Sequence, residues 1–84
     1  MNFKAAIDIM PLEALLDPQG KAVGNSMKNL GLNEIDHVRI GKHITLHVEA
    51  KTEKEARAKV EEACTKLLVN QVMEYYSFSI EKVA

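Results

Sequence analysis

Three histidines are the side chains that could ligate a metal ion in this 84-residue chain. His43 and His47 are four residues apart, a spacing that would place both on one face of a helix. The alternating pattern around them instead predicts a strand, where they lie about 13 Å apart, too far to share one metal ion. His37 and His47 would face each other only across a hairpin with a three-residue loop, giving at most two ligands. We therefore expect ordinary histidines on a polar face and no metal site.

The single cysteine and a short Gly-Lys step are the other residues that could carry out chemistry. Cys64 falls within an apolar stripe of helical spacing, which is typical of a buried structural thiol. Gly20 and Lys21 near a helix start suggest a phosphate site, but neither glycine-rich phosphate motif is present, and Asp17 partly neutralises that helix end. The sequence therefore predicts no nucleophile, metal set or phosphate loop in this chain.

The periodicity of the apolar residues predicts the elements that position these side chains. They are a strand over 3–9, a helix over roughly 18–30, a helix over 52–69 and a strand over about 74–82. Asp17 and Gly31 are suited to cap the two ends of the first helix, and Thr52 begins a capping box for the second. Gly20 and Gly24 within the first helix each cost about 1 kcal/mol relative to Ala, so we expect another segment to approach that face closely.

The segment 35–50 permits two conformations. Its apolar residues all stand at even positions, and the alternation continues through Gly41; they are Val38, Ile40, Ile44, Leu46 and Val48. A two-residue hairpin loop would set the two halves on opposite faces, but a three-residue loop would pair Ile40 with Ile44. The alternative is one strand bent at Gly41. Such a strand would span roughly 50 Å, against a radius of gyration of about 12 Å for a globule of this length, and would reach into a second subunit.

Either conformation leads to an α+β fold in a single domain over residues 1–84. The elements follow in the order strand, helix, strand, helix, strand, in which the middle strand is replaced by a strand pair if the hairpin forms. This order predicts a two-layer, ferredoxin-like sandwich with an antiparallel sheet and both helices on one face. We expect the other face to be an oligomer interface, because this mixed surface is more apolar than a solvated face usually is. These are Ala6, Met10, Met73 and Tyr75 beside His37, Arg39, Thr45 and His47.

Composition and charge narrow the class of partner. Eleven basic and twelve acidic residues give a net charge of -1, which argues against nucleic acid and against an anionic membrane surface. One cysteine cannot form an internal disulfide, and the first residues lack the apolar core of a signal peptide. We therefore expect a cytoplasmic protein whose partners are proteins or small molecules.

Three segments, taken in order, carry a specific resemblance to a known family. They are Leu16-Asp17-Pro18-Gln19-Gly20-Lys21-Ala22-Val23, Val38-Arg39-Ile40-Gly41-Lys42 and Leu67-Leu68-Val69-Asn70-Gln71-Val72. With them the chain resembles, over nearly its whole length, the PurS family, the small subunit of phosphoribosylformylglycinamidine synthase. The resemblance implies a non-catalytic subunit of a glutamine-dependent carbon-nitrogen ligase in purine biosynthesis.

The resemblance also implies partners and a role. A glutaminase subunit would release ammonia, and a large synthetase subunit would use ATP and magnesium to activate the substrate amide. This chain would bind no cofactor itself. It would be a homodimer or tetramer that joins the two enzymes and helps ammonia to pass between them. A small regulatory module that binds a metabolite is the alternative, and a stand-alone enzyme is disfavoured because no acid, base or nucleophile converges.

Seven residues are the candidates for a partner interface. They are Asp17, Gln19, Gly20 and Lys21 at the helix entrance, with Arg39, Gly41 and Lys42 at the strand bend. Helix capping by Asp17 and close packing at the glycines are the structural alternatives. Arg39 and Lys42 have no such explanation in the sequence, which favours contact with a partner.

Overall fold

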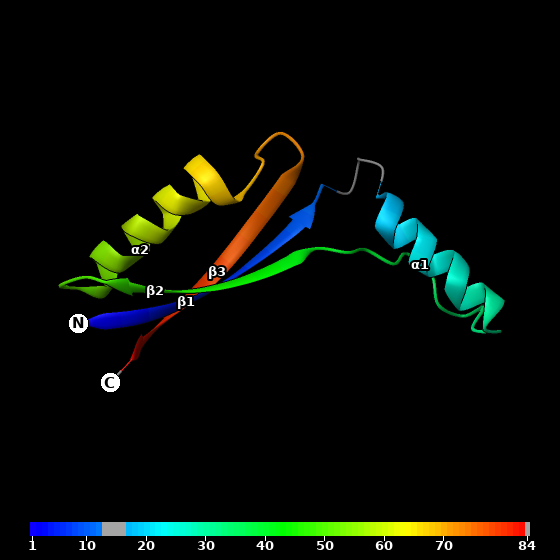
Figure 1. Cartoon of the computed structure of the whole chain (residues 1–84), viewed down its shortest axis with the longest axis horizontal. Coiled ribbons are helices and arrows are strands. Elements are labelled where there is room, and N and C mark those ends of the chain that lie inside the picture. The colour runs from blue at the N-terminus through cyan, green and yellow to red at the C-terminus, as the bar shows by residue number, and fades with distance from the viewer. Residues whose placement is uncertain (13–16, 84) are drawn as a thin grey trace.

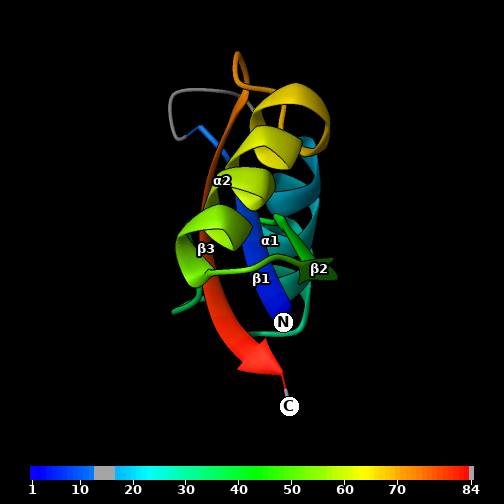
Figure 2. The same cartoon turned by 90° about the vertical axis from the view of Figure 1, so that its left-hand side faces the viewer.

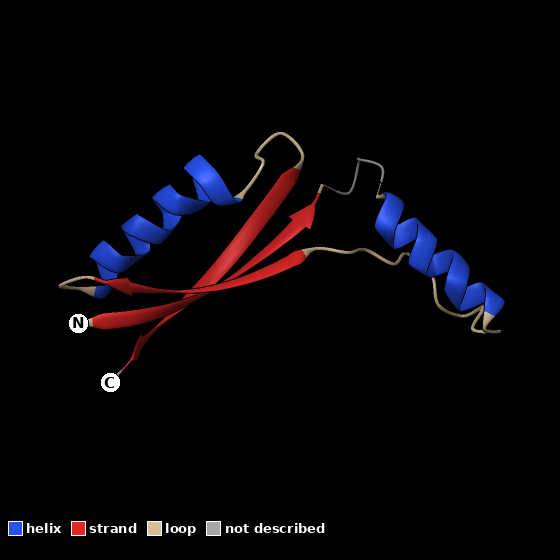
Figure 3. Ribbon diagram, viewed as in Figure 1, coloured by secondary structure: helices blue, strands red, loops and turns tan. Residues whose placement is uncertain are grey.

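The structure, a computed structural model, describes residues 1–12 and 17–83. Its elements are β1 (Asn2–Pro11), α1 (Pro18–Asn29), β2 (Lys42–Glu49), α2 (Glu53–Ala63), the π-helical turn η1 (Cys64–Leu68) and β3 (Glu74–Val83) (Figures 1 and 3). Each predicted strand and helix is therefore present within two residues of its expected bounds, with the end of the second helix widened into a π-turn. Leu16 of the first family segment lies outside the described residues.

The helix ends are capped as the sequence predicts. The carboxylate of Asp17 accepts the amide of Gly20, and the hydroxyl of Thr52 accepts the amide of Glu55. At the other end of α1, Gly31 takes a left-handed φ of 82° and the Leu32 amide donates to the Met27 carbonyl. This is the glycine-terminated helix end in which a residue with a side chain would be strained.

The three strands form one antiparallel sheet in the order β2-β1-β3. β1 is the central strand, and its register places Ala6 opposite Thr45 on one side and opposite Ser79 on the other. Because side chains alternate along a strand, these three residues share the face that α2 does not cover. α2 packs across the opposite face, as the end-on view in Figure 2 shows.

The hydrophobic core lies between α2 and this sheet. Ala5, Ile7 and Ile9 of β1 are completely buried, and they contact Val60 and Cys64 from the helical layer. A second, smaller cluster joins Phe3, Ala50 and Ala56 near the start of α2. Side chains of β2 and β3 that are themselves only partly buried pack around these residues. They are Ile44, Leu46, Val48, Tyr76, Phe78 and Ile80. The core therefore belongs to one helix and three strands.

α1 differs from the expectation that both helices cover one face of the sheet. It lies beyond the end of the sheet and covers neither face (Figure 1). The molecule is consequently elongated, with principal extents of 52 × 29 × 14 Å and a radius of gyration of 16.6 Å, against about 12 Å for a compact chain of this length. We call residues 17–41 the arm, and residues 1–12 with 42–83 the body.

The segment before β2 shows which conformation of 35–50 the chain adopts. The chain passes Gly41 without reversing, and residues 42–49 pair with β1 while residues 35–41 continue outward to α1 (Figure 1). The three-residue hairpin is therefore not formed, and the chain follows the path of the extended alternative, with strand pairing that begins only at Lys42. His37 lies in the arm with a positive φ of 55°, and His47 lies opposite Lys4 in the sheet, so the two histidines do not face each other.

Candidate functional site

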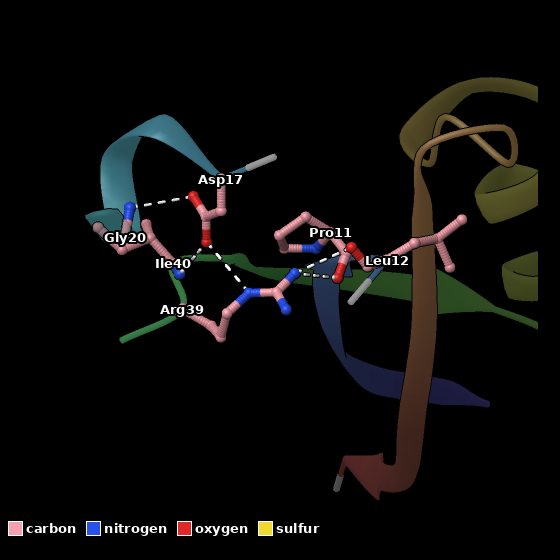
Figure 4. Close-up of polar contacts among 6 residues, drawn as sticks. All are labelled: Pro11, Leu12, Asp17, Gly20, Arg39 and Ile40. Carbon is pink, nitrogen blue, oxygen red and sulfur yellow. Dashed lines mark hydrogen bonds and ion pairs between the residues drawn. The ribbon is translucent and has the colours of Figure 1, made fainter. Parts of the chain in front are cut away.

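Asp17 lies at the corner where the arm leaves the body, and it joins two segments of chain (Figure 4). Its Oδ1 accepts the amide of Gly20 at 3.0 Å, which caps α1. Its Oδ2 accepts the amide of Ile40 at 3.1 Å, from the segment that returns toward β2. One carboxylate therefore fixes the start of α1 to the segment that leads back to β2.

Arg39 extends this connection to the end of β1. Its Nε lies 3.3 Å from Oδ2 of Asp17, and its Nη2 donates to the carbonyls of Pro11 at 2.9 Å and Leu12 at 3.0 Å (Figure 4). A planar guanidinium suits this task because its donors point in fixed directions. We call Asp17, Arg39 and the backbone groups that they bind the Asp17–Arg39 clamp.

Two glycines allow close approach of the chain at this corner. A Cβ on Gly20 would collide with the Val38 carbonyl oxygen and would lie 2.7 Å from Oδ2 of Asp17. A Cβ on Gly41 would collide with the Ile9 carbonyl oxygen and the sulfur of Met10. Gly24, in contrast, would meet only a methyl group of Val38 at 3.8 Å. The close approach predicted for this helix face is therefore confirmed at Gly20, and Gly24 has ordinary contacts.

The clamp is partly shielded from solvent, since the side chains of Asp17 and Arg39 are only 13% and 26% exposed. The amides of Gly20 and Ile40 and the Arg39 guanidinium hold the pKa of Asp17 below its usual range. The carboxylate is thus charged at neutral pH and accepts all three donors. The sequence favoured helix capping for Asp17, which the structure confirms, and contact with a partner for Arg39, whose side chain binds Asp17 and two backbone carbonyls in this chain.

The remaining candidate residues surround the same corner. Gln19 and Lys21 are exposed in the first turn of α1, and Lys42 at the start of β2 lies 3.2 Å from the carboxylate of Glu74. Asp17 borders two open depressions, one toward α1 with Lys21 and one toward β2 with Gln19 and Lys42. The structure therefore brings all seven predicted residues together, and their role in contacting a partner stays a prediction.

The described residues offer little for catalysis. Within residues 1–12 and 17–83, no three histidine, cysteine or acidic side chains are grouped so that they could hold a metal ion. Cys64 is completely buried, and burial raises the pKa of its thiol, so the prediction of a structural cysteine is confirmed. None of the helices in the described part of the chain is both long and apolar enough to cross a bilayer.

Sequence reasoning missed two polar pairs on the body. His43 Nδ1 lies 2.6 Å from Asp8 on the open face of the sheet, and the hydroxyl of Tyr76 donates to the carboxylate of Glu61 on α2. The first pair follows directly from the register, in which Asp8 stands opposite His43. It could be found only once the pairing of β1 with β2 was known.

Comparisons with known proteins agree on one family. Residues 4–82 match the PurS family model, described as phosphoribosylformylglycinamidine (FGAM) synthase. The PurS subunit of phosphoribosylformylglycinamidine synthase from Bacillus subtilis is 38% identical over 81 residues, covering 96% of this chain and 95% of that protein. The corresponding subunit from Methanocaldococcus jannaschii is 32% identical over 81 residues, with 96% of this chain and 98% of that protein covered.

Solved structures show the same relationship in three dimensions. A chain of the Thermotoga maritima PurLQS structure superposes with a TM-score of 0.89 at 33% identity, covering 96% of this chain and 99% of that one. Thermus thermophilus PurS superposes with a TM-score of 0.87 at 32% identity over the full length of both chains. The elongated arrangement of arm and body is thus that of solved PurS chains. The chain belongs to the PurS family, the PurS subunits of phosphoribosylformylglycinamidine synthase.

Proposed function

We propose that this chain is the adaptor of a glutamine-dependent phosphoribosylformylglycinamidine synthase. In this role it joins the glutaminase subunit to the ATP-dependent synthetase subunit and assists the transfer of ammonia between them. The observation that carries the proposal is the full-length similarity to a chain of the Thermotoga maritima PurLQS structure. A metabolite-binding module is not favoured, because the relatives are PurS subunits.

The chemistry in this proposal belongs to the partners. ATP and magnesium would be bound by the synthetase, and this chain would bind neither. Its own contribution would be geometric, because holding two active sites in register raises the local concentration of ammonia at the second site. We place the whole assembly in the cytoplasm.

The proposal includes a homodimer formed by exchange of arms. A ferredoxin-like sandwich has four strands and two helices over one sheet face. The body contributes three strands and α2, and the outer edge of β2 has no strand beside it among the described residues. Ile44, Leu46 and Val48 of β2 are also only partly covered by α2. One strand and one helix are therefore needed to complete each body.

The arm carries the two missing elements. Residues 38–41 run outward from β2 and could pair as a strand, and α1 lies against Val38 at Gly20 and Gly24. The partly buried Val23 and Met27 stand on the helix face that includes the buried Gly20. The arm points away from its own body (Figure 1), so it cannot supply these elements there. A second copy related by a two-fold axis could insert its arm beside β2 and receive the first arm in return.

Reconstitution tests the adaptor role. Glutamine-dependent formation of the amidine is measured with the glutaminase and synthetase subunits, in the presence and absence of this chain. The same assay with free ammonia as the nitrogen donor is the control. We expect loss of the glutamine-dependent rate without the chain and an unchanged ammonia-dependent rate. Equal glutamine-dependent rates with and without the chain would rule out the adaptor role.

Two further measurements test the assembly. Sedimentation velocity at micromolar concentration should give a species of twice the mass of the chain, and a monomer alone would exclude arm exchange. Lys21→Ala combined with Lys42→Ala should weaken binding to the larger subunits while the circular dichroism spectrum stays unchanged. Both lysines are exposed, so an effect on folding is not expected. Undiminished binding would remove these residues from the interface.

A further inference from the structure

The direction of the arm is set by contacts that join three separate stretches of chain. Arg39 reaches the last carbonyls of the β1 region, at Pro11 and Leu12, and Asp17 holds both the start of α1 and the amide of Ile40 (Figure 4). No large side-chain packing performs this task, because of the described arm residues only Gly20 is buried. Within the Asp17–Arg39 clamp, the two hydrogen bonds from Arg39 Nη2 to the Pro11 and Leu12 carbonyls join the arm to the body, and the Asp17 contacts hold Arg39 and Ile40 in place within the arm.

The two hydrogen bonds from Arg39 to the body exist only while the arm is extended. If the arm folded back, residues 35–40 would have to lie on the outer edge of β2, two strand spacings or about 10 Å from β1. Arg39 now lies beside the continuation of β1, where its Nη2 is 2.9 Å from the Pro11 carbonyl. After a reversal of the chain at Gly41, Arg39 could not keep its hydrogen bond to the Pro11 carbonyl while Ile40 stayed bound to Asp17. A folded-back chain would therefore lose the two hydrogen bonds by which the clamp joins the arm to the body.

The backbone at Gly41 supports the same conclusion. Gly41 passes directly against the Ile9 carbonyl oxygen and the sulfur of Met10, in a space too small for a side chain. The next residue, Lys42, is already paired with Ile9 in the sheet. The chain thus enters β2 in a straight line beside β1, without a hairpin turn at this position.

We propose that the Asp17–Arg39 clamp is a conformational latch that holds the arm open for exchange and prevents the chain from closing on its own body. This inference rests on the exchanged dimer proposed above. Its physical basis is differential contact: interactions present in the extended state and absent in the closed state shift the equilibrium toward the extended state. Both Asp17 and Arg39 act here as positioning residues.

The test compares Arg39→Gln with Arg57→Gln. Arg57 is on α2, where it contacts Glu53 and the ring of Phe78, so its substitution removes the same charge away from the clamp. The dimer dissociation constant is measured by sedimentation. Spin labels at Lys28→Cys and Glu81→Cys report the distance between arm and body, in labelled chains diluted with unlabelled chains. Native labelling should spare Cys64, which is completely buried.

We expect Arg39→Gln to raise the dissociation constant at least about tenfold, equivalent to about 1.4 kcal/mol, and to add a population of short label distances. Arg57→Gln should change neither quantity. Labelled chains with the wild-type Arg39 should give only long label distances, approaching the 52 Å length of the chain. Wild-type affinity with long distances alone in Arg39→Gln would overturn the proposal. A weaker dimer with only long distances would also overturn it, since Arg39 would then be an interface contact and not a latch.

A second variant and the oligomeric state of the wild type separate the remaining outcomes. Arg39→Lys keeps the charge and loses the planar donor pair, so we expect a population of short label distances smaller than that of Arg39→Gln. If Arg39→Gln fails to fold, the absence of short distances in Arg39→Lys would by itself contradict the latch. If the wild type is a monomer, arm exchange fails as a function. The label distances of monomeric Arg39→Gln would still decide whether the clamp holds the arm open.

Discussion

The body and the arm are stabilised by different kinds of interaction. In the body, Ile7, Ile9 and Val60 are at most 1% exposed and form a continuous core with α2. In the arm, Leu30 and Leu32 are 74% and 39% exposed, and the fixed contacts are hydrogen bonds at the clamp. The body has the layered core of an independent folding unit, whereas the arm has a defined direction without a core of its own.

The free energies of burial and of hydrogen bonding explain why the body and the arm differ in stability. Burial of one large aliphatic side chain contributes about 1.5–3 kcal/mol, and a typical hydrogen bond contributes about 1 kcal/mol net. α1 has 12 residues, a length at which isolated helices are marginal in water, and it contains Gly20 and Gly24. The body therefore gains stability from its own core, but the arm gains most of its stability when another surface covers it.

The largest expected effect is a loss of stability after substitution in the core of the body. Ile7→Ala should lower the free energy of unfolding by about 2–5 kcal/mol, because it leaves a cavity between β1 and α2. Urea denaturation followed by circular dichroism measures it. Thr45→Ala on the exposed sheet face is the control and should change stability by less than about 0.5 kcal/mol. A loss below 1 kcal/mol for Ile7→Ala would contradict the self-sufficient core.

The next effect distinguishes the two glycines of the arm. Gly20→Ala should destabilise α1 by about 1–3 kcal/mol, because the new methyl group collides with the Val38 carbonyl. Gly24→Ala should stabilise it by up to about 1 kcal/mol through helix propensity, since it meets nothing closer than 3.8 Å. Hydrogen exchange of the α1 amides measures both. The same sign for the two variants would show that Gly20 is not sterically required.

A smaller effect appears in acid and is confined to the arm. The pKa of Asp17 is lowered in the folded chain, first by the Gly20 amide and next by the Ile40 amide. A lowered pKa stabilises the fold above the unfolded value of 3.8, and this contribution disappears as pH falls through the lower folded value. Protection of the α1 amides should therefore fall in this acidic window, relative to the β1 amides.

Asp17→Asn isolates the contribution of this carboxylate. Other carboxyl groups with lowered pKa values, including Glu62 and Glu74, titrate in both proteins and cancel in the difference. The difference in arm protection between wild type and Asp17→Asn should be constant near neutral pH and should shrink below 3.8. A difference independent of pH would mean that the charge of Asp17 does not support the clamp.

The smallest effect sharpens the description of the body at high pH. The hydrogen bond to Glu61 raises the pKa of Tyr76 to about 12. Because the folded pKa is raised, its contribution is complete below pH 10 and is lost between pH 10 and about 12. Tyrosinate absorbance should show one group titrating near 12, absent in Tyr76→Phe. Titration of Tyr76 near 10 would contradict the contact with Glu61.

The sequence predicts the elements well because they depend on neighbouring residues. Local signals are the apolar alternation in β1, the helix cap at Asp17 and the helix end at Gly31, and the structure confirms all three. The placement of α1 could not be predicted in this way. It depends on Asp17 and Arg39, which are 22 residues apart and are brought together only by the tertiary fold. The same holds for the path of residues 35–50, since both conformations preserve the alternation of Ile40 and Ile44.

The pairing of Asn2 with Val83 places the two ends of the described strands side by side, at the opposite end of the sheet from the clamp (Figure 1). For protein engineering, this arrangement makes the ends suitable for tags, fluorophores or surface attachment that leave the corner untouched. A short linker between the termini would also allow circular permutation, with new ends opened in the exposed turn at residues 70–73. Such a permutant would separate α2 from β3 in sequence and leave the chain from β1 through the arm to β2 intact.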